Sequence, residues 1–249
     1  MLKPSLHFQR FEFKYYLPKN KADKIIPALL RHMNWDPYIA ERDEDYYYVN
    51  SLYFDSPTFG CFFDKESGVA DRKKLRYRFY NDISKESPIF LEIKRKRDAL
   101  VVKDRVSLNG FECQKTKLDQ VLKKIKKQNP ENKFLDELIW FKCRNSMRPK
   151  LFVRYKRKAF IGKLDSKLRV TFDYDIKTQK SSSLTPNPQK LIDVYKDGVV
   201  IELKYNNILP NWLHGIIQQF DLGRLAYSKY CNSLRYVYPY LDDNNYSPY

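Results

Sequence analysis

The stretch Lys74-Leu75-Arg76-Tyr77-Arg78 alternates basic side chains with apolar or aromatic ones. Alternate residues of a β-strand point to the same face of a sheet, so Arg76 and Arg78 share one face while Tyr77 lies on the other. The stretch Leu91-Glu92-Ile93-Lys94-Arg95-Lys96 follows after a short connection and alternates in the same way. Short connections favour antiparallel neighbours. The two stretches therefore predict adjoining strands with one apolar face and one charged face.

The same alternation recurs along the chain. It is found in Arg10-Phe11-Glu12-Phe13-Lys14, in Arg169-Val170-Thr171-Phe172-Asp173 and in Ile201-Glu202-Leu203-Lys204. In each stretch a carboxylate lies an even number of residues from a basic residue, so both point to the same face of the strand. This predicts a basic surface with a few embedded carboxylates. Such a surface suits a polyanion together with a divalent metal ion. The opposite face should pack against helices and comprises Phe11, Phe13, Tyr77, Phe79, Leu91, Ile93, Phe172 and Tyr174.

The hydrophobic pattern outlines the remaining elements. Strands are predicted over 6–16, 46–55, 72–81, 88–97, 99–108, 150–160 and 167–176, and a hairpin is predicted from 190–195 and 198–205 around Asp197-Gly198. Helices are predicted over 19–32, from 56 through 65, over 111–127 and over 131–143. We predict an α+β fold, an antiparallel β-barrel tunnel of about eight strands with flanking helices. Residues 1–249 would form a single domain, with a helical insert at about 111–145 and a C-terminal helical region at about 211–234.

The charge of the chain points to an anionic partner. Its 249 residues include 47 Lys and Arg against 30 Asp and Glu, for a formal net charge of +17. Such an excess costs self-repulsion, which an anion relieves. Nucleic acid, an acidic membrane and polyphosphate or a nucleotide are the candidate partners, and a basic surface without a specific partner is the alternative.

Cysteine usage and hydropathy indicate a cytoplasmic protein. Cys61, Cys113, Cys143 and Cys231 are scattered without a C-x-x-C pair, which favours free thiols in a reducing compartment. The first residues lack the apolar stretch of a signal peptide, and no run approaches the roughly 20 apolar residues that a membrane span needs. If the protein acts at a membrane, a membrane-protein partner must hold it there.

Two groups of charged residues are candidates for a site. Arg76 and Arg78 beside Lys94 and Lys96 place like charges together, which a fold tolerates if an anion neutralises them; a solvated outer face is the other interpretation. Among the carboxylates, Glu202 lies in an apolar strand and needs a partner, either Mg²⁺ or Mn²⁺ or a structural ion pair. The same choice applies to Glu12, Glu92 and Asp173, and for Asp173 an ion pair is favoured.

The chain lacks the sequence motifs of several other enzyme classes. His7, His32 and His214 lack the H-E-x-x-H spacing of zinc hydrolases. No phosphate-binding G-x-x-x-x-G-K-[ST] loop, no dinucleotide-binding G-x-G-x-x-G loop and no G-x-S-x-G elbow is present. The sequence therefore favours chemistry by positioning and electrostatics over a nucleophile or an acid–base pair.

The order of these stretches resembles the VTC domain, the catalytic module of the vacuolar transporter chaperone polyphosphate polymerase, in the CYTH-like triphosphate tunnel superfamily. The resemblance covers about residues 8–235 and also includes Ser51-Leu52-Tyr53-Phe54-Asp55, Arg154-Tyr155-Lys156-Arg157-Lys158-Ala159-Phe160 and Ser228-Lys229-Tyr230. It implies a basic tunnel in which Lys14, Arg76, Arg78, Lys94, Arg157, Arg169, Lys204, Ser228 and Lys229 contact phosphate and Glu202 coordinates the metal. Only the resemblance selects Arg157 over Arg154.

The resemblance and the residue patterns together give a full set of expected roles. Catalytic roles are expected for Arg76, Arg78, Arg157, Arg169 and Lys229, and phosphate binding for Arg10, Lys14, Lys94, Lys96, Lys204 and Ser228. Mn²⁺ or Mg²⁺ is the expected cofactor, held by Glu202 and, with weaker support, by Glu12 and Glu92. ATP and polyphosphate are the expected ligands, and nucleic acid is the less favoured one.

The expected activity is growth of a polyphosphate chain from the γ-phosphate of ATP. Two alternatives stay open: a metal-dependent triphosphatase or nucleoside triphosphatase, and a non-catalytic polyphosphate or nucleic-acid binder. Compared with the eukaryotic complex, we expect neither an SPX domain nor membrane segments within these 249 residues. The chain departs from the E-x-E-x-K pattern of the triphosphatases because Arg10 replaces the first Glu.

Overall fold

A curled antiparallel sheet forms the centre of the molecule. The computed structural model describes residues 10–84, 86–97, 100–206 and 208–241. Along the main path of the sheet the strands follow the order β1-β10-β8-β7-β3-β4-β5-β6. Their bounds are β1 Arg10–Pro18, β3 Tyr47–Asp55, β4 Asp71–Tyr80, β5 Pro88–Arg97, β6 Leu100–Asn109, β7 Arg148–Gly162, β8 Arg169–Lys180 and β10 Gly198–Asn206. Two short strands lie off this path: β2 (Met33–Trp35) pairs with β7, and β9 (Ile192–Asp193) pairs with β8.

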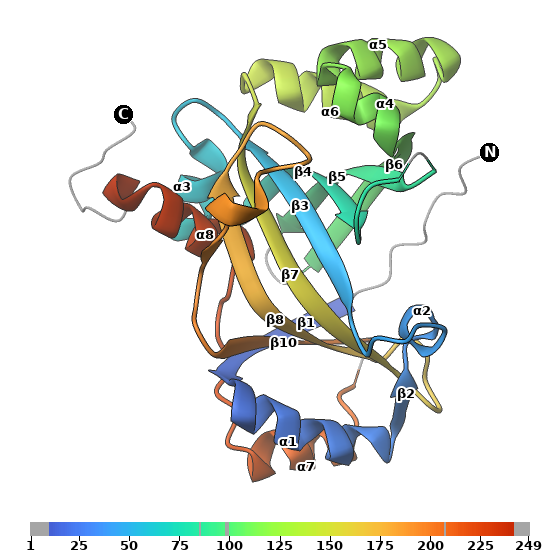
Figure 1. Ribbon diagram of the computed structural model, residues 1–249, viewed down its shortest axis with the longest axis vertical. Helices are drawn as coiled ribbons and strands as arrows, with labels where there is room; N and C mark the ends of the chain where they lie inside the picture. The colour runs from blue at the N-terminus through green and yellow to red at the C-terminus, as the bar shows by residue number, and fades with distance from the viewer. Residues whose placement is uncertain (1–9, 85, 98–99, 207, 242–249) are drawn as a thin grey trace.

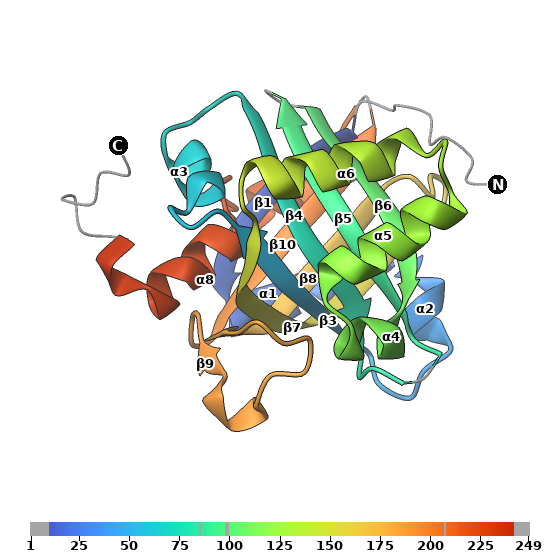
Figure 2. The same cartoon turned by 90° about the horizontal axis from the view of Figure 1, so that it is seen from above.

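The curl brings the two ends of the strand order together (Figures 1 and 2). The Lys94 Nζ on β5 lies 3.4 Å from the carboxylate of Glu12 on β1, although these strands are far apart in the strand order. Within the described ranges no hydrogen-bonded ladder joins β1 to β6. Instead, Leu225 donates its backbone N–H to the Lys14 carbonyl at 2.9 Å and so covers part of the free edge of β1. The expected antiparallel barrel is confirmed as a curled, half-closed sheet.

Helices cover the outer face of the sheet at two places (Figure 1). The first pair, α1 (Lys19–Leu30) and α7 (Asn211–Gln219), packs on β1, β8 and β10 through one apolar cluster. A second cluster joins β3, β4 and β5 to α5 (Leu118–Gln128) and α6 (Lys133–Arg144). The predicted outer face is confirmed: Phe172, Tyr174, Tyr77, Phe79, Leu91 and Ile93 are buried there, with Phe11 and Phe13 partly buried against them.

Four details differ from the sequence expectations. Residues 190–195 and 198–205 do not form a hairpin, because β9 pairs with β8 while β10 pairs with β1 and β8. The insert holds three helices, since Thr116 and Lys117 are extended and separate α4 (Gly110–Lys115) from α5. The C-terminal helical region is interrupted after α7, and α8 spans Lys229–Val237. The strand β2 and the short helix α2 (Pro37–Ala40) were not predicted.

The break before α8 coincides with a turn in the backbone. Asp221 has a positive φ of 42°, a conformation that a regular helix does not contain. The chain then runs along β1 before α8 begins, which places the start of α8 beside the inner face of the sheet. None of the helices in the described part of the chain is long and apolar enough to cross a membrane.

A buried carboxylate fixes α8 against the sheet. Asp55, at the end of β3, accepts hydrogen bonds from the backbone N–H groups of Cys61 and Phe62 at the start of α3 (Gly60–Glu66). The Tyr230 hydroxyl of α8 donates to the same carboxylate. Because buried polar groups are costly unless they are paired, this arrangement holds both helices in one position.

Candidate active site on the inner face of the sheet

The inner face of β4, β5 and β6 carries a regular array of cations. Lys74, Lys94 and Lys103 oppose one another across the three strands, and Arg76, Glu92 and Arg105 form the next row. A further row pairs Arg72 with Lys96. The predicted convergence of Arg76, Arg78, Lys94 and Lys96 on one face therefore matches the strand register.

The other half of the inner face comes from β1, β10, β8 and β7. Across these strands Lys14 opposes Glu202, which opposes Thr171. In the next row Glu12 opposes Lys204, which opposes Arg169. Arg157 on β7 opposes Asp173 on β8, and its Nε lies 2.6 Å from Asp173 Oδ1.

Lys229, the first residue of α8, projects into the centre of this arrangement. Its Nζ lies 2.9 Å from Glu202 Oε1 and also contacts Asp173. Glu202 in addition contacts Lys204 Nζ at 3.0 Å and Arg157 Nη2 at 3.6 Å. The structure thus gives Glu202 and Asp173 several cationic partners, the ion-pair arrangement that was one of the two sequence interpretations.

Arg78, unlike Arg76 on the same strand face, has no carboxylate within ion-pair distance among the described residues. Its side chain is 9% exposed and hydrogen-bonds only with hydroxyls: Ser51 Oγ at 3.3 Å and the Tyr155 OH at 3.4 Å from Nη2. By contrast, Arg76 Nη2 binds Glu92 Oε2 at 2.7 Å, and Glu92 is fully buried. Within the described residues Arg78 is therefore a buried cation that no carboxylate contacts directly, although Glu92 is near enough to favour its charge, and its remaining donors could bind an anion.

The dense charge perturbs several side chains. Burial by itself would raise the pKa of Glu202. The positive charges of Lys204, Lys229 and Lys14 outweigh this effect, so the pKa lies well below its ordinary range. Loss of hydration outweighs the attraction of Glu12 and lowers the pKa of Lys94 to about 8. Burial opposes ionisation of Tyr53, yet Arg76 and Arg78 lower its pKa to about 8. Such shifts are typical of functional sites, although structural ion pairs also produce them.

Not every expected residue lies at the centre. Arg169 is the first residue of β8, is partly exposed and pairs with Asp36, and Lys96 is exposed. Ser228 is the N-cap of α8, and its Oγ lies 3.2 Å from Lys74 Nζ. The backbone of Arg10 pairs with Asn206, whereas its side chain lies outside the described part of the chain. Arg154 points away from the site and contacts Asp82.

Sequence reasoning missed several members of the inner face. Lys74, Lys103 and Arg105 lie on the same strand face as the cations that were predicted. The alternation of side chains along the strands was therefore sufficient to predict them as well. Ser51, Tyr53 and Tyr155 are neutral, and their positions beside Arg76 and Arg78 follow only from the pairing of β3 with β4 and β7. Hydroxyl groups in a strand carry no charge pattern that would mark them.

Glu12 and Glu202 supply the donor chemistry for a divalent cation. Lys14 Nζ lies 3.1 Å from Glu12 Oε1 and 3.9 Å from Glu202 Oε1, so one ammonium group contacts both carboxylates. Mg²⁺ is typically bound by one or two carboxylates plus substrate phosphates, which this pair fits. Glu92 fits less well, because its side chain is fully buried, whereas those of Glu12 and Glu202 are 13% and 9% exposed. Within the described residues no three acidic, His or Cys side chains gather into a metal-binding group.

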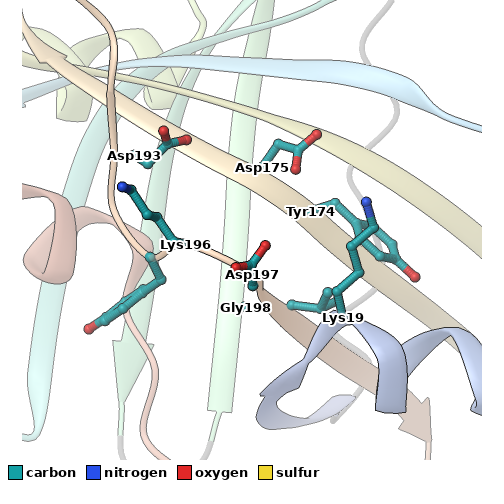
Figure 3. A pocket seen from close by; sticks show the side chains of 9 residues that line it. Lys19, Tyr174, Asp175, Asp193, Lys196, Asp197 and Gly198 are labelled. Carbon is teal, nitrogen blue, oxygen red and sulfur yellow. The ribbon is translucent and has the colours of Figure 1, made fainter.

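A separate hollow of about 230 Å³ lies outside the inner face, near the start of α1 (Figure 3). It is lined by Lys19, Asp175, Asp193, Lys196 and Asp197, among others. Asp175 pairs with Lys156 and Asp193 with Lys177, so both carboxylates have structural partners. The lining includes none of the inner-face cations, and we assign it no part in the site.

The chain is similar to known proteins over most of its length. A model of the VTC domain matches residues 9–238. Vacuolar transporter chaperone complex subunit 2 of Saccharomyces cerevisiae is 31% identical over 155 residues, which are 54% of this chain. The match spans 19% of the yeast protein, about a fifth of its length.

Two solved structures share the fold. A candidate adenylate cyclase from Bacillus halodurans has a TM-score of 0.50 at 12% identity, covering 92% of this chain and 99% of its own. A candidate adenylyl cyclase from Hippeastrum with a dominant triphosphatase activity has a TM-score of 0.50 at 13% identity, covering 92% of this chain and 96% of its own. At these identities the likeness concerns the fold alone, which is the CYTH-like triphosphate tunnel fold.

Proposed function

The chain belongs to the VTC domain family, and from this premise we propose that it transfers the γ-phosphate of ATP to a growing polyphosphate chain on its inner face. The observation that carries the proposal is Arg78. Its buried guanidinium makes no direct ion pair with a described carboxylate and donates to hydroxyls, so its donors could instead bind an anionic phosphate oxygen. The forked donors of Arg suit phosphate oxygens particularly well.

The inner face can supply most of the catalytic effect through positioning and charge. Arg78, with Arg76 and Arg157 nearby, would hold non-bridging oxygens and offset the charge that the transferring phosphoryl group carries. Lys14, Lys94, Lys204 and Lys229 add ammonium groups around the same centre, and Arg169 and Lys96 add cations toward its rim. Ser228 would add a hydroxyl beside Lys74.

The attacking group in this reaction is the terminal phosphate of the chain. It is anionic already, so the reaction needs no protein base to remove a proton. This agrees with the composition of the inner face, whose carboxylates are held by cations and where no His–carboxylate pair occurs among the described residues. Alignment of the two phosphates then becomes the main task of the protein.

A divalent ion would be held by Glu202 and Glu12. Bound there, Mn²⁺ or Mg²⁺ would neutralise charge on the triphosphate. In its absence Lys14 contacts both carboxylates. The protein's own contribution would be to keep these carboxylates ionised, because the surrounding lysines lower the pKa of Glu202.

Hydrolysis of a triphosphate is the second candidate function. The paired carboxylates Glu12 and Glu202 favour it, because a metal-activated water could replace the phosphate chain as the attacking group. A non-catalytic role in binding polyphosphate is the third candidate. All three functions would use the anion site at Arg78. They differ in whether the bound phosphate reacts and, if it does, in the product that forms.

Incubation with ATP and Mn²⁺ or Mg²⁺ separates these functions. Gels stained for phosphate chains would show long products for a polymerase, whereas orthophosphate without chains indicates a triphosphatase. Tight polyphosphate binding without turnover indicates a binder. Arg78→Gln should abolish the reaction, and the matched control Lys123→Gln, an exposed lysine of α5, should leave it unchanged. If Arg78→Gln kept full activity, the proposed site would be wrong.

A further inference from the structure

Part of the cation array lies at the open edge of the sheet. Arg76 and Arg78 are buried, whereas Lys96 and Arg105 are exposed and Arg72 is partly exposed. Lys103, between them on β6, has 39% of its side chain exposed. The cations therefore continue from the buried centre across β5 to solvent, because β6 is the last strand of the sheet.

Three of these edge cations have no carboxylate partner. Within the described part of the chain, no ion pair involves Arg72, Lys96 or Arg105. Arg105 instead lies over the Phe90 ring, with its Cζ 4.3 Å from the ring centroid. Burial together with the proximity of Arg72, Lys14 and Arg224 lowers the pKa of Lys96. Many other lysines and arginines of the described surface contact a carboxylate, whereas these three cations do not.

The strip extends beyond what a compact triphosphate needs. The rows of Arg72 and Arg105 are four strand positions apart in register, a distance of about 13 Å along the sheet. In the proposed function the buried arginines bind the triphosphate at the centre. A longer polyanion that continued out of the centre would meet the edge cations in turn.

We propose that Arg72 and Arg105 form part of a track that binds the extended portion of a long polyphosphate chain at the open edge of β4, β5 and β6. This inference rests on the proposed function, since it takes the inner face as a phosphate site. It assigns the two arginines no role in the transfer itself. Their effect should therefore depend on the length of the bound chain.

The test compares binding of tripolyphosphate and of a polyphosphate of several tens of units by titration calorimetry without ATP. The double variant Arg72→Gln/Arg105→Gln removes two positive charges. The matched control Lys123→Gln/Lys127→Gln removes two exposed charges from α5. We expect the first variant to lose on the order of tenfold in affinity for the long chain and less than twofold for tripolyphosphate. The salt dependence of long-chain binding should also become shallower.

The outcomes separate this inference from the proposed function. If the first variant and the control bind the long chain equally well, the track does not exist. If the first variant loses tripolyphosphate binding to the same extent as long-chain binding, the arginines belong to the central site and the track is again wrong. If the unmodified protein binds neither ligand, the proposed function fails, and this inference fails with it. Thermal unfolding of each variant checks that the fold is retained.

Discussion

Arg78 faces Ser51 directly across the β3–β4 ladder, and among the described residues its guanidinium hydrogen-bonds to the hydroxyls of Ser51 and Tyr155. Two residues away on the same strand face, Arg76 is bound to the carboxylate of Glu92. Two adjacent arginines of one strand face are thus in different electrostatic states. One is neutralised within the protein, and the other is available to neutralise a ligand.

Arg78→Gln should therefore affect the binding of phosphate much more than the stability of the fold. Because no carboxylate loses a direct ion-pair partner, the free energy of unfolding of the ligand-free protein should fall by only about 1 kcal/mol, the contribution of the hydrogen bonds to Ser51 and Tyr155. The same change should weaken tripolyphosphate binding by on the order of 100-fold, because a charge-assisted hydrogen bond is lost. Chemical denaturation and calorimetry measure the two effects. A variant that is less stable and still binds would show that Arg78 has a structural role.

Arg76→Gln should cost more stability than Arg78→Gln. It leaves the fully buried Glu92 with Lys103 as its remaining cationic partner, at 3.4 Å, so the free energy of unfolding should fall by about 3 kcal/mol. The double variant Arg76→Gln/Glu92→Gln should recover most of this loss, because no buried charge is then left unpaired. A double variant as unstable as the single one would mean that packing, and not the ion pair, sets the cost.

Binding of tripolyphosphate should weaken as the pH rises from 7 to 9. Burial lowers the pKa values of Lys94 and Lys103 to about 8, so both ammonium groups lose their charge in this range. The same shifts mean that the folded state holds fewer protons than the unfolded state between about pH 8 and 10.5, so these groups make the protein more stable as the pH rises there. Affinity and stability should consequently change in opposite directions.

The double variant Lys94→Arg/Lys103→Arg is the control for this pH dependence. Arginine stays charged throughout the range, so the decline in affinity should flatten, whereas titration of the ligand itself affects both proteins equally. Calorimetry at pH 7, 8 and 9 gives the comparison. Identical pH profiles for the variant and the parent protein would rule out the two lysines as the titrating groups.

Glu202→Gln should abolish metal-dependent turnover while leaving metal-free binding intact. The change removes a negative charge from among Lys14, Lys204 and Lys229, so metal-free affinity for tripolyphosphate should hold or increase. Enhancement of binding by Mn²⁺ should be lost, and Glu12→Gln should show a weaker loss of the same kind. Turnover with Mn²⁺ at the parent rate in Glu202→Gln would exclude this carboxylate as a metal ligand.

The alternation of side chains along the strands predicted much of the fold and of the candidate site. The parity of Arg76, Lys94 and Glu202 placed them on one face, because side chains in a strand alternate whatever the rest of the protein does. The pattern gave the outer face as well, where Phe172 and Leu91 pack against helices. The interruption between α7 and α8 was missed, since it depends on a turn at Asp221 and on the free edge of β1.

The sequence by itself determined that cations and a few carboxylates share one face of an antiparallel sheet, because that follows from local geometry and composition. Only the tertiary structure decided which cations are neutralised. Glu92 reaches Arg76, and Asp173 and Glu202 reach Arg157 and Lys229, while Arg78 is left among hydroxyls. The physical reason is that an ion pair requires contact within a few ångströms, and the curl of the sheet and the position of α8 set those distances.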